Sequence, residues 1–329
     1  MNEKKIKVLI TGGAGYVGKG LSNFLTTKNF DVSVIDNLSS GTKFGLNKKI
    51  KFYKYNLSQK NKIINIIKNN KYNIVIHLAA KIDARESNKN KSKYLLNNYL
   101  YSKMLLDIII KYKIKNFIFA SSAAIYGDYK KKYLEHDKKK PINYYGISKL
   151  KFENYLKKKN INFAILRFFN IGGAIKAINC GRIKNIGIFK ILCNSIYLGN
   201  KFNIYGNQFN TKDGYSIRDY IHVKDVILII HKSINYLISK NKNLIINCGS
   251  GKGTSLGKII KYYQKFTSNK LFLKLSKNFK GDPSEVVSNI SKMKKKLKYI
   301  PKYSNLNKIA YSSYQWENYL SHLKDRVSL

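Results

Sequence analysis

The chain has 329 residues and a formal net charge of +46, so it is long enough for one large two-lobed domain, or two smaller ones, with a substantial core. Only five of its 63 basic residues are Arg, and the excess of Lys, Asn, Ile and Tyr follows A/T-rich codons, so we interpret the charge as compositional drift and expect no nucleic-acid partner. No apolar stretch reaches the length of a membrane span and the first residues lack a signal-peptide core, which predicts a soluble cytoplasmic protein with no membrane partner.

Short apolar runs alternate with helical patterns through the first half of the chain. Helices are predicted over 15–28, 58–69 and 94–112, and a fourth helix carries Tyr145 and Lys149. Several of the intervening runs are solidly apolar, which predicts a parallel sheet covered by helices on both faces. The predicted strands are 5–11, 31–36, 50–55, 73–77, 116–122 and 161–167.

A glycine-rich turn follows the first predicted strand. Gly12, Gly15 and Gly18 form G-x-x-G-x-x-G at the start of a helix, where glycine lets the backbone turn tightly and lets a pyrophosphate approach the helical N–H groups. Asp36 closes the second strand, where a carboxylate accepts the 2′-hydroxyl of an adenosine ribose and repels a 2′-phosphate. The pattern predicts an NAD site; the alternative is a purely structural turn, with Asp36 capping the loop that follows.

The turn places the chain in the α/β class, with a doubly wound parallel sheet (a Rossmann fold) and a smaller C-terminal substrate lobe. Residues 1–172 are predicted to form the NAD-binding domain, which also takes strands near 217–250. Residues 173–329 are predicted to form mainly the substrate domain. Within it, 199–214 reads as a loop, and a strand over 243–248 returns to the main sheet.

Tyr145 and Lys149 lie four residues apart and therefore face the same side of a helix. An ammonium about 5 Å from a phenol favours the phenolate by ~3 kcal/mol at an effective dielectric constant of ~20, which lowers the pKa of the tyrosine toward neutrality. Ser122 ends the fifth strand, at the sheet edge where ligands of such sheets bind. We therefore predict that Ser122, Tyr145 and Lys149 are catalytic, with Tyr145 as the base for an alcohol proton.

These motifs resemble the extended short-chain dehydrogenase/reductase family, and within it the UDP-hexose 4-epimerases. The most diagnostic run is Ile-Arg-Asp-Tyr-Ile-His-Val over 217–223. The other matching segments span nearly the whole chain: Thr11–Gly18, Asp36–Leu38, His77–Ala80, Glu86–Ser87, Asn97–Asn98, Ser121–Asp128, Tyr145–Lys149, Leu166–Gly172, Asn247–Gly251, Gly281–Pro283 and Trp316.

The resemblance implies two groups of site residues. The cofactor group is Gly12, Gly15, Tyr16, Val17, Gly18, Asp36, Asn37, Asn56, Leu57, Ala79, Ala80, Asn97, Tyr145 and Lys149. The substrate group is Ser122, Asn170, Asn185, Arg218, Asp282 and Val286. Arg218 suits a diphosphate because a guanidinium pairs with phosphate bidentately; the alternative is an internal ion pair with Asp219 or Asp225.

The implied reaction is NAD-dependent epimerisation at C4 of a UDP-hexose, which interconverts UDP-galactose and UDP-glucose in carbohydrate metabolism. Tyr145 as phenolate takes the proton of the 4-hydroxyl while hydride passes to the nicotinamide, and Lys149 keeps the pKa of Tyr145 low. The 4-keto sugar turns about its phosphate link and takes the hydride on its other face. The resemblance also implies a homodimer that pairs through the helices 94–112 and 145–158.

Four positions depart from the family pattern. Phe279 stands where an arginine usually faces the diphosphate, Asn56 replaces an aspartate at the adenine, and Ile82 falls where some members have a lysine near the nicotinamide. Val286 stands where some members have a bulky tyrosine against the 2-substituent of the sugar. The smaller side chain predicts room for an N-acetyl group, so a UDP-N-acetylglucosamine 4-epimerase or a dual-specificity epimerase is the alternative function.

Other interpretations stay open at this point. A nucleotide-sugar dehydratase needs an acid and a base directly after the strand-five hydroxyl, where this chain has Ala123 and Ala124. A reductase or decarboxylase of the same superfamily and a non-catalytic NAD- or RNA-binding scaffold are the remaining alternatives; the intact Ser122, Tyr145 and Lys149 disfavour the scaffold. Neither a metal site nor a disulfide is predicted, because the three cysteines are widely spaced with no histidine at metal-ligand spacing.

Overall fold

The structure is a computed structural model that describes residues 5–129, 132–267, 271–276 and 282–324. The chain divides into two compact units. Unit 1 comprises 1–127, 138–168 and 227–246, and unit 2 comprises 128–137, 169–226 and 247–329.

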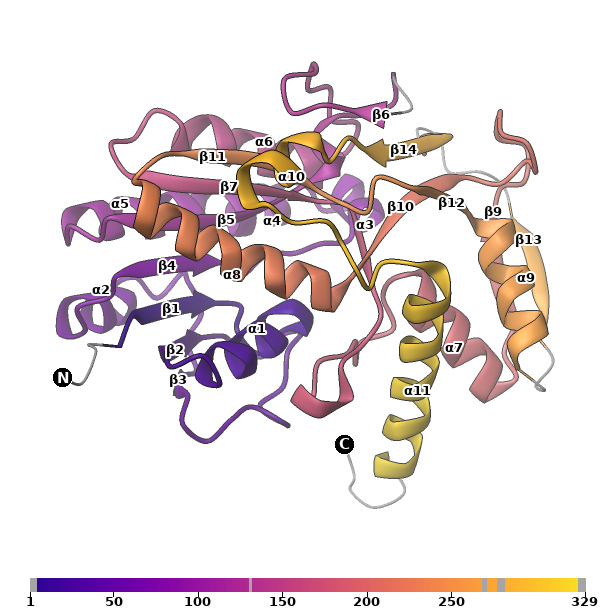
Figure 1. Ribbon diagram of the computed structural model, residues 1–329, viewed down its shortest axis with the longest axis horizontal. Coiled ribbons are helices and arrows are strands. Elements are labelled where there is room, and N and C mark those ends of the chain that lie inside the picture. Colours follow the sequence, from indigo (N-terminus) through magenta and orange to yellow (C-terminus); the bar gives the residue numbers. More distant parts are fainter. Residues whose placement is uncertain (1–4, 130–131, 268–270, 277–281, 325–329) are drawn as a thin grey trace. The chain divides into compact units, whose positions relative to one another are not determined.

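Unit 1 is built on a seven-stranded sheet in the order β11-β7-β5-β4-β1-β2-β3 (Figure 1). All strand pairings from β3 across to β7 are parallel, and the order reverses between β1 and β4. This is the doubly wound arrangement, so the predicted fold class is confirmed. The strands are β1 Lys7–Thr11, β2 Asp31–Ile35, β3 Lys51–Tyr53, β4 Ile74–His77, β5 Asn116–Ser122, β7 Asn162–Phe168 and β11 Leu244–Cys248, whose last two residues belong to unit 2.

Helices cover both faces of this sheet because its central strands are apolar on both sides. Phe117 and Phe119 of β5 pack with Phe152 in a cluster on one face, while Ile118 between them is equally buried on the other. In Figure 1, α1 and α8 lie in front of the sheet, and Phe24 of α1 contacts His231 of α8 edge to face, with ring centroids 5.4 Å apart. The helices are α1 Tyr16–Thr26, α2 Lys60–Asn69, α3 Ala84–Lys89, α4 Lys91–Leu95, α5 Tyr101–Lys111, α6 Tyr144–Leu156 and α8 Val223–Lys240, whose first four residues belong to unit 2.

The long helix predicted over 94–112 is interrupted. A π-helical turn, Leu96–Leu100, separates α4 from α5. The turn carries Asn98, whose side chain is buried and donates a hydrogen bond to the carbonyl oxygen of Lys81. The spacing of apolar residues predicted the helix but held no information about this turn.

Unit 2 contains a five-stranded sheet in the order β12-β10-β14-β6, with β8 paired to β10, and a separate pair of strands, β13 and β9. Helices α7, α9 and α11 supply most of its core. Strand β9 lies inside the segment predicted as a loop, so that part of the prediction was wrong. The strands are β6 Lys132–Tyr133, β8 Asn170–Gly172, β9 Phe202–Tyr205, β10 Ile217–His222, β12 Gly253–Ser255, β13 Leu273–Ser276 and β14 Glu285–Ser288; the helices are α7 Ile188–Leu198, α9 Leu256–Phe266, α10 Ser291–Leu297 and α11 Leu306–Lys324.

Neither a disulfide nor a membrane-spanning helix is found among the described residues. Cys180, Cys193 and Cys248 are free thiols, and all three are buried. Across the described part of the chain, no helix is both long enough and apolar enough to cross a membrane.

Candidate active site

The glycine turn between β1 and α1 packs directly on the end of β4. Gly12 has a φ of +74°, and a Cβ on it would lie 2.6 Å from the backbone nitrogen of Ala79. A Cβ on Gly18 would lie 2.1 Å from the carbonyl oxygen of Gly12. Both positions therefore require glycine, because any side chain would force the turn open. Gly15 is the N-cap of α1 and has no side chain to cover the helical N–H groups.

Asp36 faces this turn from the end of β2. Its two carboxylate oxygens accept hydrogen bonds from the backbone nitrogens of Ala14, at 2.9 Å, and Leu38, at 2.8 Å. The carboxylate thus shapes the turn, as the structural alternative requires, but each of its oxygens has a second lone pair for a ribose hydroxyl. The turn, the uncapped helix start and the acid together fit the adenosine diphosphate half of NAD.

The other residues predicted to hold the cofactor follow neighbouring strands of unit 1. Asn56 and Leu57 follow β3, Ala79 and Ala80 follow β4, and Asn37 follows β2. Carboxyl ends of parallel strands share one edge of a sheet, so these residues lie along the edge that carries the glycine turn. Asn56 has its side-chain oxygen engaged locally, since it accepts a hydrogen bond of 2.9 Å from the backbone of Ser58.

Helix α6 brings Tyr145 and Lys149 to the same edge. Asn143 caps the helix by accepting a hydrogen bond of 2.8 Å from the backbone of Gly146. A Cβ on Gly146 would lie 2.3 Å from the carbonyl oxygen of Ala124, so glycine here lets the first turn of α6 pack on the segment that follows Ser122. Ser122 ends β5, and its hydroxyl accepts a hydrogen bond of 3.2 Å from the backbone of Ala124.

Lys149 is buried in unit 1 beneath Tyr145. Its Nζ donates a hydrogen bond of 2.7 Å to the carbonyl oxygen of Ala120 and lies 5.9 Å from the centre of the Tyr145 ring. Burial lowers the pKa of Lys149 from its usual 10.5 to about 7, and the negative charge of Glu153 opposes that fall. The ammonium is therefore held close to its titration point at neutral pH.

A buried polar chain behind this site was missed from the sequence. The Ser102 hydroxyl donates to the Asn98 carbonyl oxygen at 2.8 Å, so His77 Nε2 donates to Ser102, at 2.7 Å, and the Thr11 hydroxyl donates to His77 Nδ1, at 2.6 Å. Burial first, and then the charge of Lys149, lower the pKa of His77 to about 3, which keeps it neutral.

The side chain of Asn98 connects this series of buried hydrogen bonds to α6. Its amide nitrogen donates to the carbonyl oxygen of Lys81, at 2.9 Å, and to the hydroxyl of Ser148, at 3.2 Å, and its amide oxygen accepts from the backbone of Lys81 at 2.9 Å. The prediction singled out Asn97, which is half-buried, whereas Asn98 is the buried partner of the pair. The burial of Asn98 against Lys81 and Ser148 distinguishes the two.

The remaining residues predicted to bind the substrate belong to unit 2. Arg218 of β10 and Val286 of β14 are partners in register on neighbouring strands. Asn170 of β8 is exposed and pairs with Tyr220 of β10, and Asn185 is exposed in the segment before α7. Asp282 is half-buried, whereas Phe279, the departure from the family pattern at the diphosphate, lies outside the described residues.

The two acids considered as partners of Arg218 accept hydrogen bonds from other groups. Asp219 accepts hydrogen bonds from the backbone of Ser250, at 2.7 Å, and of Gly251, at 3.0 Å, and from Ser288. Asp225 accepts from the hydroxyl of Tyr299 and from backbone groups of the segment that precedes α11. Arg218 Nη1 donates to the carbonyl oxygens of Ile217, at 2.8 Å, and Ser284, at 3.3 Å.

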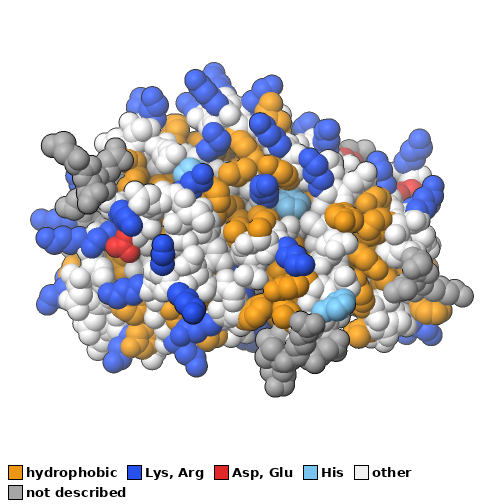
Figure 2. Space-filling model, turned by 60° about the horizontal axis from the view of Figure 1, so that its bottom comes forward, with side chains coloured by type: hydrophobic (Ala, Val, Ile, Leu, Met, Phe, Trp, Pro, Cys, Tyr) orange, Lys and Arg blue, Asp and Glu red, His pale blue; other side chains and the backbone are white. Residues whose placement is uncertain are grey.

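Metal ligands and surface charge are the remaining features that bear on binding by the described residues. No cluster of three His, Cys, Asp or Glu side chains that could hold a metal ion occurs among them. Figure 2 shows Lys and Arg side chains spread over one face of the molecule, mixed with hydrophobic side chains and few acids. The positive charge is dispersed on that face.

Comparison with known proteins shows the family to which the chain belongs. Residues 8–249 match the family described as "NAD dependent epimerase/dehydratase family". The UDP-glucose 4-epimerase of Lactobacillus helveticus is 31% identical over 319 residues, which cover 94% of this chain and 97% of that protein.

Two solved structures extend the similarity to three dimensions. UDP-glucose 4-epimerase from Bifidobacterium longum in complex with NAD+ and UDP superposes with a TM-score of 0.87 at 27% identity, covering 95% of this chain and 98% of that one. The UDP-Glc/GlcNAc 4-epimerase from Campylobacter jejuni superposes with a TM-score of 0.82 at 30% identity, covering 95% and 99%. With a family match over most of its length and a relative above 30% identity, this chain belongs to the NAD dependent epimerase/dehydratase family.

Proposed function

We propose that the protein interconverts UDP-galactose and UDP-glucose by NAD-dependent epimerisation at C4 of the sugar. The observation that carries the proposal is the packing of α6 on the end of β5, which joins Tyr145 and Lys149 to Ser122 on the edge of the sheet that carries the glycine turn. The relatives of near-full length are named as enzymes of this reaction.

In the proposed reaction the protein's own residues move protons and hold the sugar. Tyr145 as phenolate takes the proton of the sugar 4-hydroxyl, and Ser122 hydrogen-bonds the same oxygen. Lys149, when charged, stabilises the phenolate. Bound NAD supplies reversible acceptance of hydride from the sugar carbon. The glycine turn, Asp36 and the residues after β3 and β4 would hold that cofactor.

In this proposal the two units supply different groups of residues. Unit 1 carries the cofactor and the proton-transfer residues, and unit 2 supplies Asn170, Asn185, Arg218 and Asp282 for the nucleotide sugar. The guanidinium of Arg218 suits the diphosphate, since its fork can pair with two phosphate oxygens. Anchoring the nucleotide lets the sugar turn without leaving the enzyme, which epimerisation requires.

The test is a coupled assay of purified protein with UDP-galactose. We expect wild type to form UDP-glucose and Tyr145→Phe to be at least ~100-fold slower, because the phenyl ring cannot accept the proton. Tyr144→Phe is the matched control, since the neighbouring tyrosine lies in the same helical turn outside the proposed proton path. An inactive wild type, or a Tyr145→Phe variant as active as the control, would contradict the proposal.

A second candidate substrate is UDP-N-acetylglucosamine. Val286, in register with Arg218, has a smaller side chain than the tyrosine that some family members carry at this position. The relative from Campylobacter jejuni is named for both plain and N-acetyl sugars. Activity on the plain hexoses but none on the N-acetyl forms would exclude this candidate.

Three predictions from the sequence complete the proposal: a homodimer, a cytoplasmic location and the absence of a nucleic-acid partner. Leu96 and Leu100, on one of the helices predicted to pair, are 43% and 48% exposed and offer apolar surface for a second copy. Light scattering of the purified protein would show the mass of a dimer or of a single chain.

A further inference from the structure

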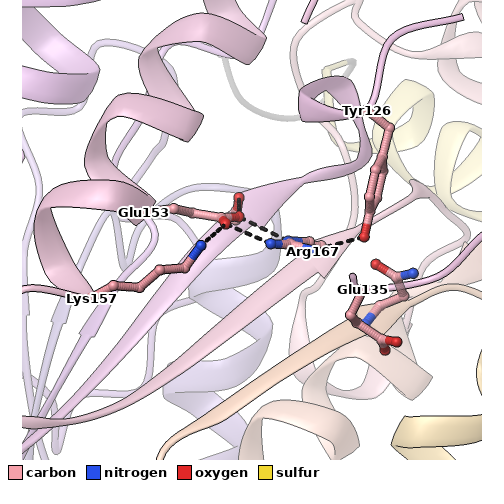
Figure 3. Close-up of polar contacts among 7 residues, drawn as sticks. Tyr126, Glu135, Glu153, Lys157 and Arg167 are labelled. Carbon is pink, nitrogen blue, oxygen red and sulfur yellow. Dashed lines mark hydrogen bonds and ion pairs between the residues drawn. The ribbon is translucent and has the colours of Figure 1, made fainter. Parts of the chain in front are cut away.

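A buried ion pair lies directly behind the proposed catalytic residues. Glu153 has no exposed surface and Arg167 is 1% exposed. The Arg167 Nε and Nη2 atoms donate to the two carboxylate oxygens of Glu153 at 3.0 and 2.8 Å, so the pair is bidentate (Figure 3). Lys157, which caps the C-terminus of α6, reaches the same carboxylate at 3.5 Å.

The pair joins the helix that carries the base to both sides of Ser122. Ser121 donates a hydrogen bond of 2.6 Å to Glu153, and Arg167 Nη1 donates one of 2.8 Å to the hydroxyl of Tyr126. Ser121 precedes Ser122, and Tyr126 ends the short 3₁₀ turn, Ala123–Ile125, that follows it.

The helix places the three ionisable groups in a row. Tyr145, Lys149 and Glu153 are spaced four residues apart on α6 and therefore share one side of it. Arg167 stands opposite Ser121 in the parallel pairing of β5 with β7. Arg167 therefore links Glu153 of α6 to the strand pair whose β5 member ends at Ser122.

We propose that Glu153 and Arg167 are positioning residues that hold Tyr145 and Lys149 of α6 at a defined separation from Ser122 of β5. The inference rests on the proposed function and deepens it, because it names the residues that set the proton-transfer geometry. A displacement of about 1 Å in such a geometry costs on the order of 100-fold in rate.

Stability alone gives a weak reason for this pair. A buried ion pair gains little over apolar side chains of the same size, because the attraction between the charges must first offset their desolvation. Apolar side chains would hold α6 on the sheet but would not set its register, whereas a bidentate pair with Ser121 and Tyr126 as further partners has one geometry.

The charge of Glu153 also reaches the site. Around Lys149 the ionisable groups are Tyr145 and Glu153 on α6 and His77 on β4, with Arg167 on β7 beyond Glu153. His77 is neutral. The negative charge of Glu153 raises the pKa of Lys149 and so opposes the lowering caused by burial. Removing that anion lowers the pKa of Lys149 further, and activity that needs the ammonium should then be lost at a lower pH.

The test compares Glu153→Gln with the double variant Glu153→Leu/Arg167→Met in the assay with UDP-galactose. For Glu153→Gln we expect kcat to fall ~10-fold or more with KM within ~3-fold of wild type, and the alkaline limb of the kcat profile to move to lower pH. The double variant should regain the Tm of wild type but not its kcat, because apolar packing replaces the pair without its geometry.

The matched control is Glu317→Gln, which removes the carboxylate of the buried ion pair between Lys190 of α7 and Glu317 of α11, in unit 2. We expect it to lower Tm as Glu153→Gln does while leaving kcat and its pH profile unchanged. Full recovery of kcat in the double variant, or loss of kcat only in proportion to the folded fraction, would overturn the inference.

Two outcomes separate this inference from the proposed function. If wild type does not epimerise UDP-galactose, the proposed function fails. If wild type is active and Glu153→Gln keeps its rate and pH profile, only the positioning role fails. If Glu153→Gln does not fold, Tyr126→Phe removes one partner of Arg167 at small structural cost; an unchanged kcat in this variant would likewise overturn the inference.

Discussion

At the scale of single residues, Lys149 shows how burial and charge oppose each other. Its pKa lies near 7 in the folded protein against 10.5 for an ordinary lysine, because burial disfavours the ammonium. Between these two pH values the unfolded chain binds more protons than the folded one, so the stability contributed by this residue rises with pH through that window. Below about pH 7 Lys149 is charged in both the folded and the unfolded chain, so the free energy of unfolding is reduced by the full cost of burying the ammonium.

We therefore expect Lys149→Met to be more stable than wild type by more than ~1 kcal/mol at pH 6, with the advantage shrinking toward pH 10. Its kcat should fall ~100-fold or more, since nothing then stabilises the phenolate of Tyr145. Urea unfolding at several pH values measures the first effect. Lys151→Met, at an exposed position on the same helix, should show no such pH dependence. A stability difference that is constant with pH would contradict the assignment.

At the scale of elements, the glycine turn shows that a loop can be as tightly packed as a core. A Cβ on Gly18 would meet the carbonyl oxygen of Gly12 at 2.1 Å, and the same turn packs against the end of β4. Gly18→Ala should open the turn and lower the amount of NAD that copurifies with the protein at least ~10-fold, because the helical N–H groups no longer converge on the pyrophosphate.

Gly199 provides the control for this prediction. It ends α7 with a φ of +63°, and no atom lies within 4 Å of a Cβ added there. Gly199→Asn should cost less than ~1 kcal/mol, since asparagine tolerates the left-handed conformation, and should leave the bound NAD unchanged. The amount of nucleotide released on denaturing each variant measures the effect, and equal amounts from both would contradict the prediction.

At the scale of the whole molecule, the net charge of +46 is the dominant property. The charges repel one another, and salt screens them over a length that falls from ~30 Å at 0.01 M to ~10 Å at 0.1 M. We expect Tm to rise by several degrees between these concentrations of sodium chloride. Sodium sulfate at equal ionic strength should give a similar rise. A Tm that is independent of salt would contradict the role of self-repulsion.

Much of unit 1 could be predicted because its signals are local. The glycine spacing, Asp36 at the end of a strand, and Tyr145 four residues before Lys149 depend on neighbours in the chain and on the period of helix and strand. Strand β5 was predicted at its observed bounds for the same reason, since an apolar run flanked by polar residues defines both ends.

The parts that escaped prediction depend on contacts distant in the chain. Asn98 lies 50 residues from Ser148, and Glu153 lies 32 residues from Ser121. Gly146 could be explained only once Ala124 was seen against it. Strand β9 pairs with β13 from a segment some 70 residues further along, so its own residues carried only a weak signal.

By itself, the sequence predicted the order of the first six strands of the main sheet in unit 1, the class of cofactor turn and the identity of the proposed base. These predictions follow from backbone sterics and short-range spacing, which are encoded in short segments of the sequence. The tertiary structure alone decided that burial lowers the pKa of Lys149 to about 7 and that Asn98 is buried while Asn97 is half-buried. It also decided that Glu153 of α6 pairs with Arg167 and accepts a hydrogen bond from Ser121, the residue before Ser122. Burial and long-range hydrogen bonds arise only when distant segments exclude water from one another, and no local pattern encodes that.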